Sequence, residues 1–380
     1  MKVLIDARLY GLENAGLGRY LVNLIDELTK IDSKNKYTIL LRKKYFNGLK
    51  LPKNWKKVLA DFKHYSLIEQ IRLPKVIANH KPNIVHFPHF NVPVFYKGSF
   101  VVTIHDILMH KQKGRQATTL PLPMYRLKRI FYWIVFRKAV KASVKIIVPS
   151  KVVKRQIVDY YQLPADKFVV TYEGLDEKVV PKGKSNEVLK KYKINSPYFV
   201  YAGNAYPHKN LERAIEAVVF LNKKHKRKIL FAIASARSVF LKRLRNMISD
   251  LNAQRYVKLL GFVPDEDLGA LFGKSVGFLF PSLSEGFGLP GLEAIAAGTI
   301  VLASDIPVFK EVYKDNILYF NPYDFSSIEK VMENAINMSK EERERLIEKS
   351  QKFIKRYSWA KMARQTFKIY EDSASIRQSK

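Results

Sequence analysis

Cysteine is absent from the 380-residue chain. Disulfide bonds, thiolate zinc sites and a cysteine nucleophile are therefore excluded together, and a reducing compartment is compatible with the sequence. Long hydrophobic runs are also absent: no stretch of about 20 apolar residues suits a membrane-spanning helix. The opening segment MKVLIDARLY reads as a strand rather than a signal peptide. We therefore expect a folded protein in the cytoplasm.

Acidic residues are scarce, with 34 Asp and Glu against 67 Lys and Arg and a formal charge of +33. The excess is uneven, because residues 1–175 hold 32 Lys and Arg but only 11 Asp and Glu. A field of this sign attracts nucleic acid, anionic lipid or phosphorylated substrates. Charge alone does not distinguish among these partners, so local pattern has to decide.

Short runs rich in Val, Ile and Phe alternate with longer amphipathic stretches. The runs are KVLIDA, YTILL, NIVHF, FVVTIHD, KIIVPS, KFVVTY, YFVYAG, KILFAIA, YVKLLG, VGFLFPS and TIVLAS. They are apolar on both faces, which suits parallel sheets covered by helices on each side. We predict an α/β protein with two Rossmann-like, doubly wound domains at residues 1–180 and 181–355, followed by a helical tail at 356–380. Such sheets bind ligands beyond the carboxyl ends of their strands, so a cleft between the domains is the expected site.

A glycine-rich loop precedes a helix in the segment VGFLFPSLSEGFGLPGLEAIAAGTIVLAS. Pro290 suits the first turn of that helix and Gly298 suits its end. The backbone N–H groups around Phe287, Gly288 and Leu289 would then point at an anion bound at the helix start. A diphosphate fits such a site.

Two carboxylates bracket this anion site. Glu285 enters the loop and Glu293 lies one turn into the helix. Both could accept hydrogen bonds from sugar hydroxyls. Spacing alone leaves equally open that Glu285 is a solvated loop residue and that Glu293 is an ordinary helix position.

The segment Glu285-GFGLPGL-Glu293 resembles the defining motif of a large family of retaining nucleotide-sugar glycosyltransferases, known as family 4 or group 1. The resemblance covers nearly the whole chain and implies the two-domain GT-B fold. It implies an acceptor-binding first domain, a nucleotide-sugar-binding second domain and a C-terminal helix that returns to the first. In the family the first glutamate lies beside the donor sugar and the second binds the ribose, so the resemblance gives Glu285 and Glu293 those roles.

Two motifs in the first half fit the same resemblance. In DARLYGLENAGLGRYLVNLIDEL, Gly16 and Gly18 would let the backbone approach a phosphate, although such a pair is as often just a turn. In TIHDILMH, His105 and Asp106 emerge at the end of a strand, and the matching histidine of the family contacts the transferred sugar. A strand-end His-Asp pair is otherwise commonly structural.

In the second half, YFVYAGNAYPHKNLERAIEA resembles the family's segment that carries basic groups to the diphosphate. Lys209 takes that role by resemblance. Many relatives have an arginine where this chain has Asn204, so the phosphates would rely on Lys209 and on backbone amides. By the same resemblance, Phe262 and Val263 would place their backbone against the nucleotide base. The segment fits a plain link between a strand and a helix equally well. Glu311 is a looser candidate for a donor contact.

Within this family, the segment GN-x-x-PHKNLE resembles the O-antigen mannosyltransferase branch more closely. Mannose from GDP-mannose is therefore the expected donor, with another hexose from a UDP-sugar as the alternative. The acceptor would be a saccharide or a lipid-linked acceptor in cell-surface polysaccharide or glycolipid synthesis. The resemblance implies retained configuration, a departing phosphate oxygen that helps to deprotonate the acceptor, and no cofactor or required metal. His86 and His110 are taken as structural.

The region 111–155 is basic and aromatic, with no acidic residue and 13 Lys and Arg between Asp106 and Asp159. Wound as a helix, PMYRLKRIFYWIVFRKAVKASVK would place five cations on about one third of its circumference. These are Arg126, Arg137, Lys138, Lys141 and Lys145, and the apolar remainder includes Phe131, Trp133 and Phe136. Such a helix suits an anionic lipid interface, so we predict peripheral attachment to the inner face of the cell membrane.

Three alternatives to this reading remain. The basic segment equally fits a domain helix whose apolar side belongs to the core and whose lysines are solvated. A nucleic-acid-binding protein would explain the charge, but no usual DNA- or RNA-binding motif is present, so no nucleic acid partner is expected. An epimerase or a phosphorylase could use the same fold, but the loop around Glu285 and Glu293 favours transfer.

Overall fold

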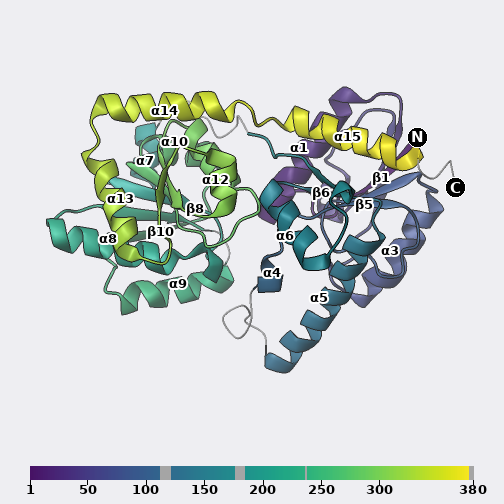
Figure 1. The fold of residues 1–380 in the computed structure, drawn as a ribbon, viewed down its shortest axis with the longest axis horizontal. Coiled ribbons are helices and arrows are strands. Elements are labelled where there is room, and N and C mark those ends of the chain that lie inside the picture. The colour runs from purple at the N-terminus through teal and green to yellow at the C-terminus, as the bar shows by residue number, and fades with distance from the viewer. Residues whose placement is uncertain (112–120, 176–184, 236–237, 376–380) are drawn as a thin grey trace. The chain divides into compact units, whose positions relative to one another are not determined.

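The computed structural model describes residues 1–111, 121–175, 185–235 and 238–375 (Figure 1). It divides into two compact units, one formed by Met1–Gly174 with Ser358–Lys380 and the other by Leu175–Tyr357. The predicted boundary at 180 falls within 176–184, outside the described residues. The second division lies between Tyr357 and Ser358, where the sequence analysis places it after residue 355.

A seven-stranded parallel sheet forms the centre of the first unit, in the order β3-β2-β1-β4-β5-β6-β7. Its strands are β1 (Lys2–Asp6), β2 (Lys36–Leu41), β3 (Trp55–Leu59), β4 (Ile84–Phe87), β5 (Phe100–Thr103), β6 (Lys145–Val148) and β7 (Phe168–Val170). Every residue of β4 and β5 is buried, as the two-sided apolar pattern predicts. Strand β3 was not predicted, because Lys56 and Lys57 break its apolar run; charged residues are typical of an edge strand.

Helices cover both faces of this sheet. They are α1 (Ala15–Ile31), α2 (Lys43–Phe46), α3 (Leu67–Asn79), α4 (Leu108–Lys111), α5 (Leu122–Ala142), α6 (Lys151–Tyr161) and α15 (Trp359–Ser375). The last of these packs against α1 and against β4, β5 and β6, far away in the sequence (Figure 1). The expected return of the C-terminal helix to the first domain is therefore confirmed.

A buried polar chain attaches α15 to the sheet. The Tyr370 hydroxyl lies 2.6 Å from His86 Nδ1, and His86 Nε2 lies 2.8 Å from the hydroxyl of Thr103. Burial, with the nearby charge of His105, lowers the pKa of His86 to about 3, so the ring stays neutral. A neutral imidazole can exchange hydrogen bonds with two hydroxyls without burying a charge. His86 is thus fully used in holding the helix.

The second unit has a six-stranded parallel sheet in the order β10-β9-β8-β11-β12-β13. Its strands are β8 (Tyr198–Ala202), β9 (Leu230–Ala234), β10 (Val257–Gly261), β11 (Gly277–Phe280), β12 (Val301–Ser304) and β13 (Leu318–Phe320). The strand order reverses between β8 and β11. In doubly wound sheets the ligand binds at this point, beyond the carboxyl ends of the two strands.

The helices of the second unit are α7 (Ser185–Lys191), α8 (Leu211–His225), α9 (Ser238–Asp250), α10 (Asp265–Gly273), α11 (Leu289–Ala296), α12 (Pro307–Tyr313), α13 (Phe325–Asn337) and α14 (Lys340–Ile354). Helix α11 begins as predicted, with Pro290 in its first turn, and Gly298 follows its end at φ +83°. The predicted α/β architecture of two parallel-sheet domains is confirmed. No helix among the described residues is long and apolar enough to cross a membrane.

Candidate active site

The loops that follow β8 and β11 are joined directly at the point where the strand order reverses. The backbone N–H of Leu283 donates to the carbonyl of His208 at 2.8 Å. Asn210, in the left-handed conformation at φ +56°, donates from its side-chain amide to the carbonyl of Pro281 at 3.1 Å. These bonds fix the short 3-10 turn Pro207–Lys209 against the loop that carries Glu285.

Lys209 and Glu285 form an ion pair across these two loops. Lys209 Nζ lies 2.5 Å from Glu285 Oε1, and the side chains are 16% and 13% exposed. Burial and the charge of Lys209 lower the pKa of the neighbouring His208 to about 4, so His208 adds no charge. One cation and one carboxylate therefore lie side by side where solvent still reaches them. A phosphate can compete for the cation, and a sugar hydroxyl can bond to the carboxylate.

The start of α11 is shaped by Tyr313, which the sequence analysis missed. Gly288 has φ +113°, and its carbonyl accepts a hydrogen bond from the buried Tyr313 hydroxyl. A Cβ on Gly291 would lie 2.3 Å from the same hydroxyl oxygen, so both glycines are needed where they stand. Burial raises the pKa of Tyr313 far above its ordinary value, and the negative charges of Glu285 and Glu293 add to the effect.

The other predicted residues of this unit occupy separate positions. Glu293 is buried on α11, and Phe287 is buried against the ring of Tyr357, with 5.4 Å between centroids. The carbonyl of Asn204 accepts from the Tyr201 hydroxyl at 2.8 Å in the loop after β8.

Four further candidates lie after β10, at the start of α11 and on α12. Phe262 and Val263 follow β10, at the edge of the sheet; Phe262 is 73% exposed and Val263 is buried. Leu289 is the first residue of α11, and Glu311 lies on α12. The geometry thus joins Lys209 to Glu285, whereas Phe262 follows β10, which lies two positions away from β8 in the sheet.

In the first unit, His105 follows β5 and uses both ring nitrogens. Its Nδ1 lies 3.2 Å from Glu173 Oε1, and its Nε2 lies 3.1 Å from the carbonyl oxygen of Pro88. These two contacts hold the ring between the segments that follow β7 and β4. The ring of Tyr20 meets His105 edge to face at 4.8 Å. Glu173 was missed because it stands at the end of β7, 68 residues away in sequence.

Asp106, the neighbour of His105, is exposed. Its carboxylate accepts from the backbone N–H of Leu108 at 2.9 Å, which supports the start of α4. His110, on α4, lies between the hydroxyls of Tyr132 and Tyr161 at 2.6 and 2.8 Å. Burial, with the charge of Arg129, lowers the pKa of His110 to about 4, which fits the structural role expected for it.

The predicted glycine loop after β1 differs from the structure. Gly16 and Gly18 lie in the first turn of α1, not in a loop before it. A Cβ on Gly18 would lie 1.8 Å from the carbonyl oxygen of Gly11, so Gly18 is needed for close packing on the preceding turn. Gly16 faces open space. The strained glycine of this turn is Gly11, at φ +117°.

One group with metal-ligating side chains occurs in the described part of the chain. His225, Glu329 and Glu333 hold ligand atoms within 4.8 Å of one another. Lys224 Nζ already lies 3.1 Å from Glu329 Oε1 and 3.8 Å from Glu333 Oε2. The group sits at the end of α8, which starts at the carboxyl edge of the sheet, so it lies toward the opposite edge from Lys209. It is an ion-pair cluster that joins α8 to α13.

Comparison with known proteins identifies the family of the chain. Residues 185–353 match the family model described as Glycosyl transferases group 1, and residues 15–179 match Glycosyltransferase Family 4. The O-antigen chain mannosyltransferase RfbU of Salmonella typhimurium is 28% identical over 65% of this chain and 63% of its own length. The O-antigen chain mannosyltransferase B of Escherichia coli is 26% identical over 81% of this chain and 79% of its own length.

Solved structures share the fold over nearly the whole chain. WaaG, a glycosyltransferase involved in lipopolysaccharide biosynthesis, superposes with a TM-score of 0.75 at 15% identity and covers 97% of this chain and 99% of its own. Anabaena HepE in complex with UDP-glucose gives 0.74 at 15% identity and covers 98% and 100%. Two parallel-sheet α/β domains define the GT-B fold that these structures share. The chain belongs to the group 1 and family 4 glycosyltransferases, and it is an enzyme of that class.

Proposed function

We propose that this enzyme transfers mannose from GDP-mannose, with retention of configuration, to a saccharide or lipid-linked acceptor in cell-surface polysaccharide synthesis. The observation that carries the proposal is the ion pair of Lys209 and Glu285 at the reversal of strand order, beside the start of α11. Lys209 and the helix dipole would stabilise the leaving diphosphate, and Glu285 would bond to the donor sugar. Glu293 would bind the ribose. Apart from the donor and the acceptor, no cofactor or metal is assigned a step.

Mannose is favoured by relatives that are named mannosyltransferases. A UDP-hexose is the second candidate, because HepE has been solved with UDP and with UDP-glucose. Product release separates the two donors. The purified protein is incubated with GDP-mannose or UDP-glucose and an oligosaccharide or polyprenyl-linked acceptor mixture, and the released nucleotide is measured. Release of GDP alone supports the mannose proposal, release of UDP alone replaces mannose, and release of neither contradicts the transfer reaction.

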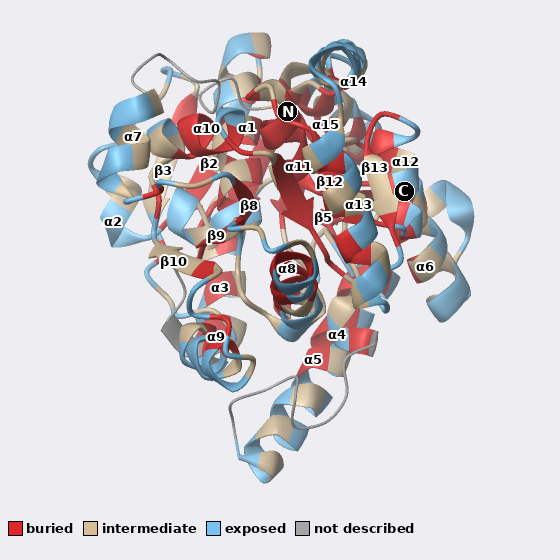
Figure 2. Ribbon diagram, turned by 90° about the vertical axis from the view of Figure 1, so that its left-hand side faces the viewer, coloured by how far each residue is buried: buried red, intermediate tan, exposed pale blue. Residues whose placement is uncertain are grey.

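We also propose peripheral attachment to an anionic membrane through α5. The exposed side of this helix carries Leu127, Ile130 and Ile134, each about half exposed, among the cations of the basic region (Figure 2). This apolar and basic combination suits the interface of an anionic bilayer. Phe131 is also about half exposed.

The residues of α5 that are available for contact with a membrane differ from those predicted from the sequence. Phe136 is fully buried in the core, and Trp133 stacks on Tyr160 at 5.7 Å, so the aromatic lipid face predicted from the sequence is wrong at these positions. Lys145 belongs to β6 rather than to the helix, because α5 ends at Ala142. Part of the basic region, 112–120, lies outside the described residues.

A further inference from the structure

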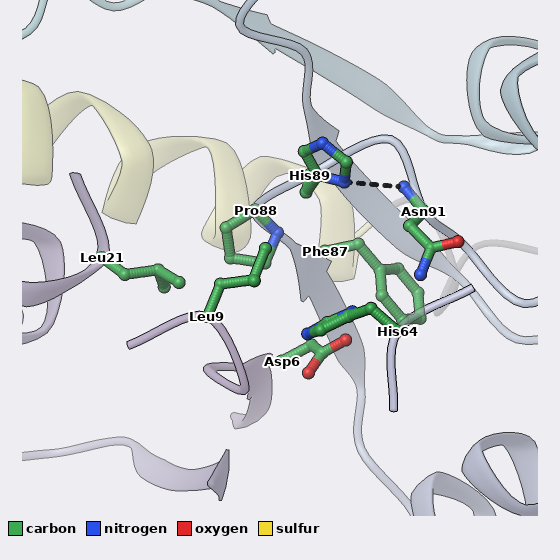
Figure 3. Close-up of a pocket in the computed structure, with 8 residues that line it drawn as sticks. All are labelled: Asp6, Leu9, Leu21, His64, Phe87, Pro88, His89 and Asn91. Carbon is green, nitrogen blue, oxygen red and sulfur yellow. Dashed lines mark hydrogen bonds between the residues drawn. The ribbon is translucent and has the colours of Figure 1, made fainter. Parts of the chain in front are cut away.

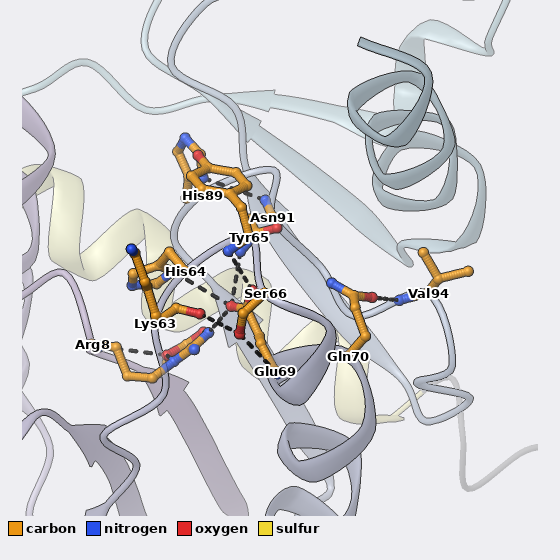
Figure 4. A network of polar contacts seen from close by, with 11 residues as sticks. Arg8, Lys63, His64, Tyr65, Ser66, Glu69, Gln70, His89, Asn91 and Val94 are labelled. Carbon is orange, nitrogen blue, oxygen red and sulfur yellow. Dashed lines mark hydrogen bonds and ion pairs between the residues drawn. The ribbon is translucent and has the colours of Figure 1, made fainter. Parts of the chain in front are cut away.

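A cavity lies in the first unit where β1 and β4 end, and its volume is about 10 Å³ (Figure 3). A space of this size holds no more than one water-sized group. Its wall includes Asp6, which accepts two bonds from the buried Arg8 at 2.7 and 2.6 Å, and Arg8 also donates to Glu69 Oε1 at 2.7 Å (Figure 4). This network joins β1 to α3, and the cavity beside it is too small for a sugar or a nucleotide.

A second polar cluster lies in the second unit, between α8 and α13, which pack side by side (Figure 1). At one end of their contact, the ring of Phe220 meets that of Phe325 edge to face, with 5.4 Å between centroids. At the other end, just past α8, Arg227 Nη2 donates to Asn337 Oδ1 at 3.1 Å. The two helices therefore run in the same direction, and the residues between these contacts are held in register.

Three side chains of this cluster have the spacing of metal ligands. Glu329 and Glu333 are four residues apart, so they lie on one face of α13. His225, the last residue of α8, places its Nε2 3.1 Å from Glu329 Oε1 and 3.1 Å from Glu333 Oε1. Zinc bonds of 2.0–2.1 Å in tetrahedral geometry put ligand atoms about 3.3 Å apart. Two of the three ligand pairs are thus close to this spacing, and the carboxylate pair lies within 4.8 Å.

The burial and the chemistry of these side chains suit zinc. Glu329 is 3% exposed, while His225 and Glu333 are 21% and 25% exposed. The helices thus fix the ligands, and solvent reaches one side, from which an ion and a water as fourth ligand can enter. Imidazole nitrogen together with carboxylate oxygen is a ligand set that zinc accepts, whereas Mg²⁺ and Ca²⁺ prefer oxygen ligands alone.

Lys224 supplies the cation that a metal ion has to displace. Its Nζ lies 3.1 Å from Glu329 Oε1 and 3.8 Å from Glu333 Oε2, and its side chain is 45% exposed. A lysine ammonium on a flexible, half-exposed stem can turn into solvent. A divalent ion brings two charges to the carboxylates where the ammonium brings one, and it also binds the imidazole nitrogen. The exchange of the ammonium for the ion therefore favours metal binding.

We propose that His225, Glu329 and Glu333 form a zinc site that fastens the end of α8 to α13, with Lys224 as the cation that the ion displaces. The site carries no step of the transfer reaction, because α8 starts beside Lys209 and the cluster lies at its other end. Bound zinc stabilises the second unit, since the folded chain holds the three ligands together and the unfolded chain does not.

The test is calorimetric titration of Zn²⁺ into the full, metal-free chain, with Mg²⁺ titrated in parallel. Zn²⁺ affinity should fall at least tenfold in His225→Gln, which keeps an N–H for the carboxylates but removes the imidazole. It should rise several-fold in Lys224→Met, which removes the competing cation; a gain of affinity cannot come from unfolding. The matched control is His80→Gln, which replaces the histidine that follows α3 in the first unit and should change nothing.

Zinc binding that weakens in His225→Gln and strengthens in Lys224→Met supports the site. Equal Zn²⁺ affinity in wild type and His225→Gln overturns it, as does weaker binding in Lys224→Met, no Zn²⁺ binding to wild type, or Mg²⁺ binding as tight as that of Zn²⁺. Binding of GDP and UDP is measured on the same samples and should be identical in wild type and His225→Gln. Absence of nucleotide binding in wild type would contradict the proposed donor site, while the Zn²⁺ titrations would still decide the metal site.

Discussion

Replacing Glu69 by alanine should destabilise the first unit strongly, because one carboxylate holds four groups. Glu69 accepts from Arg8, Asn91 and the backbone of Tyr65 at 2.7, 2.8 and 2.7 Å, and it pairs with His64. Its side chain is fully buried. Removing one partner from a buried ion pair costs about 3–5 kcal/mol, because the remaining charge stays buried and undercompensated. For a unit of this size that loss lowers the melting temperature by roughly 6–20 °C.

Differential scanning calorimetry of wild type and Glu69→Ala measures this shift. The control is Asp26→Ala, which removes an exposed ion pair with Lys30 and should cost less than about 1 kcal/mol. A shift for Glu69→Ala no larger than that of the control would refute the assignment of the network as a structural support. The variant should leave the second unit and its nucleotide binding intact.

The same variant should lose its effect in acid. Glu69 and Asp6 have pKa values below their ordinary range in the folded state, so each contributes stability that is present above its unfolded pKa of about 4 and is lost as pH falls through the folded value. The difference in the free energy of unfolding between wild type and Glu69→Ala should therefore be full at pH 7 and shrink below about pH 4. Urea titrations between neutral and acidic pH measure it. If the difference in the free energy of unfolding between the two proteins grows as the pH falls, the stabilising role assigned to the Glu69 carboxylate is contradicted.

Two further variants test the loop of the second unit and the lipid face. Gly288→Ala should destabilise by about 1–3 kcal/mol and weaken nucleotide binding, since φ is +113° and the new Cβ would lie 2.7 Å from the Tyr313 hydroxyl, whereas Gly16→Ala should be neutral. Thermal shift with and without nucleotide measures both, and equal behaviour of the two variants would contradict the argument. Leu127→Ser with Ile130→Ser should reduce sedimentation with anionic liposomes at low salt several-fold, while Phe220→Ser, an exposed position of the second unit, should not. Unchanged sedimentation in the double variant would exclude α5 as the contact.

The sequence predicts the architecture well because buried parallel strands are apolar on both faces. It misses β3 because Lys56 and Lys57 on an edge strand remove that signal. It finds Lys209 and Glu285 through motifs, yet their ion pair depends on two loops that are 76 residues apart and meet only where the strand order reverses. Glu173 and Tyr313 lie outside the motifs. Asp6 and Arg8 open the first motif, but their pairing with Glu69 could not be predicted because the fold brings these residues together.

For the basic helix α5, the sequence predicts the helix but not which of its apolar residues are buried. A helical wheel shows which residues share a face, but it does not show which apolar face is covered by the rest of the domain. Phe136 lies in the core, while Ile130 is exposed, and both are apolar in the sequence. Distinguishing them requires the position of α5 against β5.

Calorimetric titration of GDP and UDP tests most directly whether the Lys209 loop binds the diphosphate of a nucleotide sugar. Wild type is compared with Lys209→Met and with Lys191→Met, which removes a surface cation paired with Asp267 in the same unit. Loss of a charge-assisted hydrogen bond should weaken nucleotide binding about tenfold to a hundredfold in Lys209→Met only. Equal affinity in Lys209→Met and wild type, or no nucleotide binding by wild type, would contradict the account.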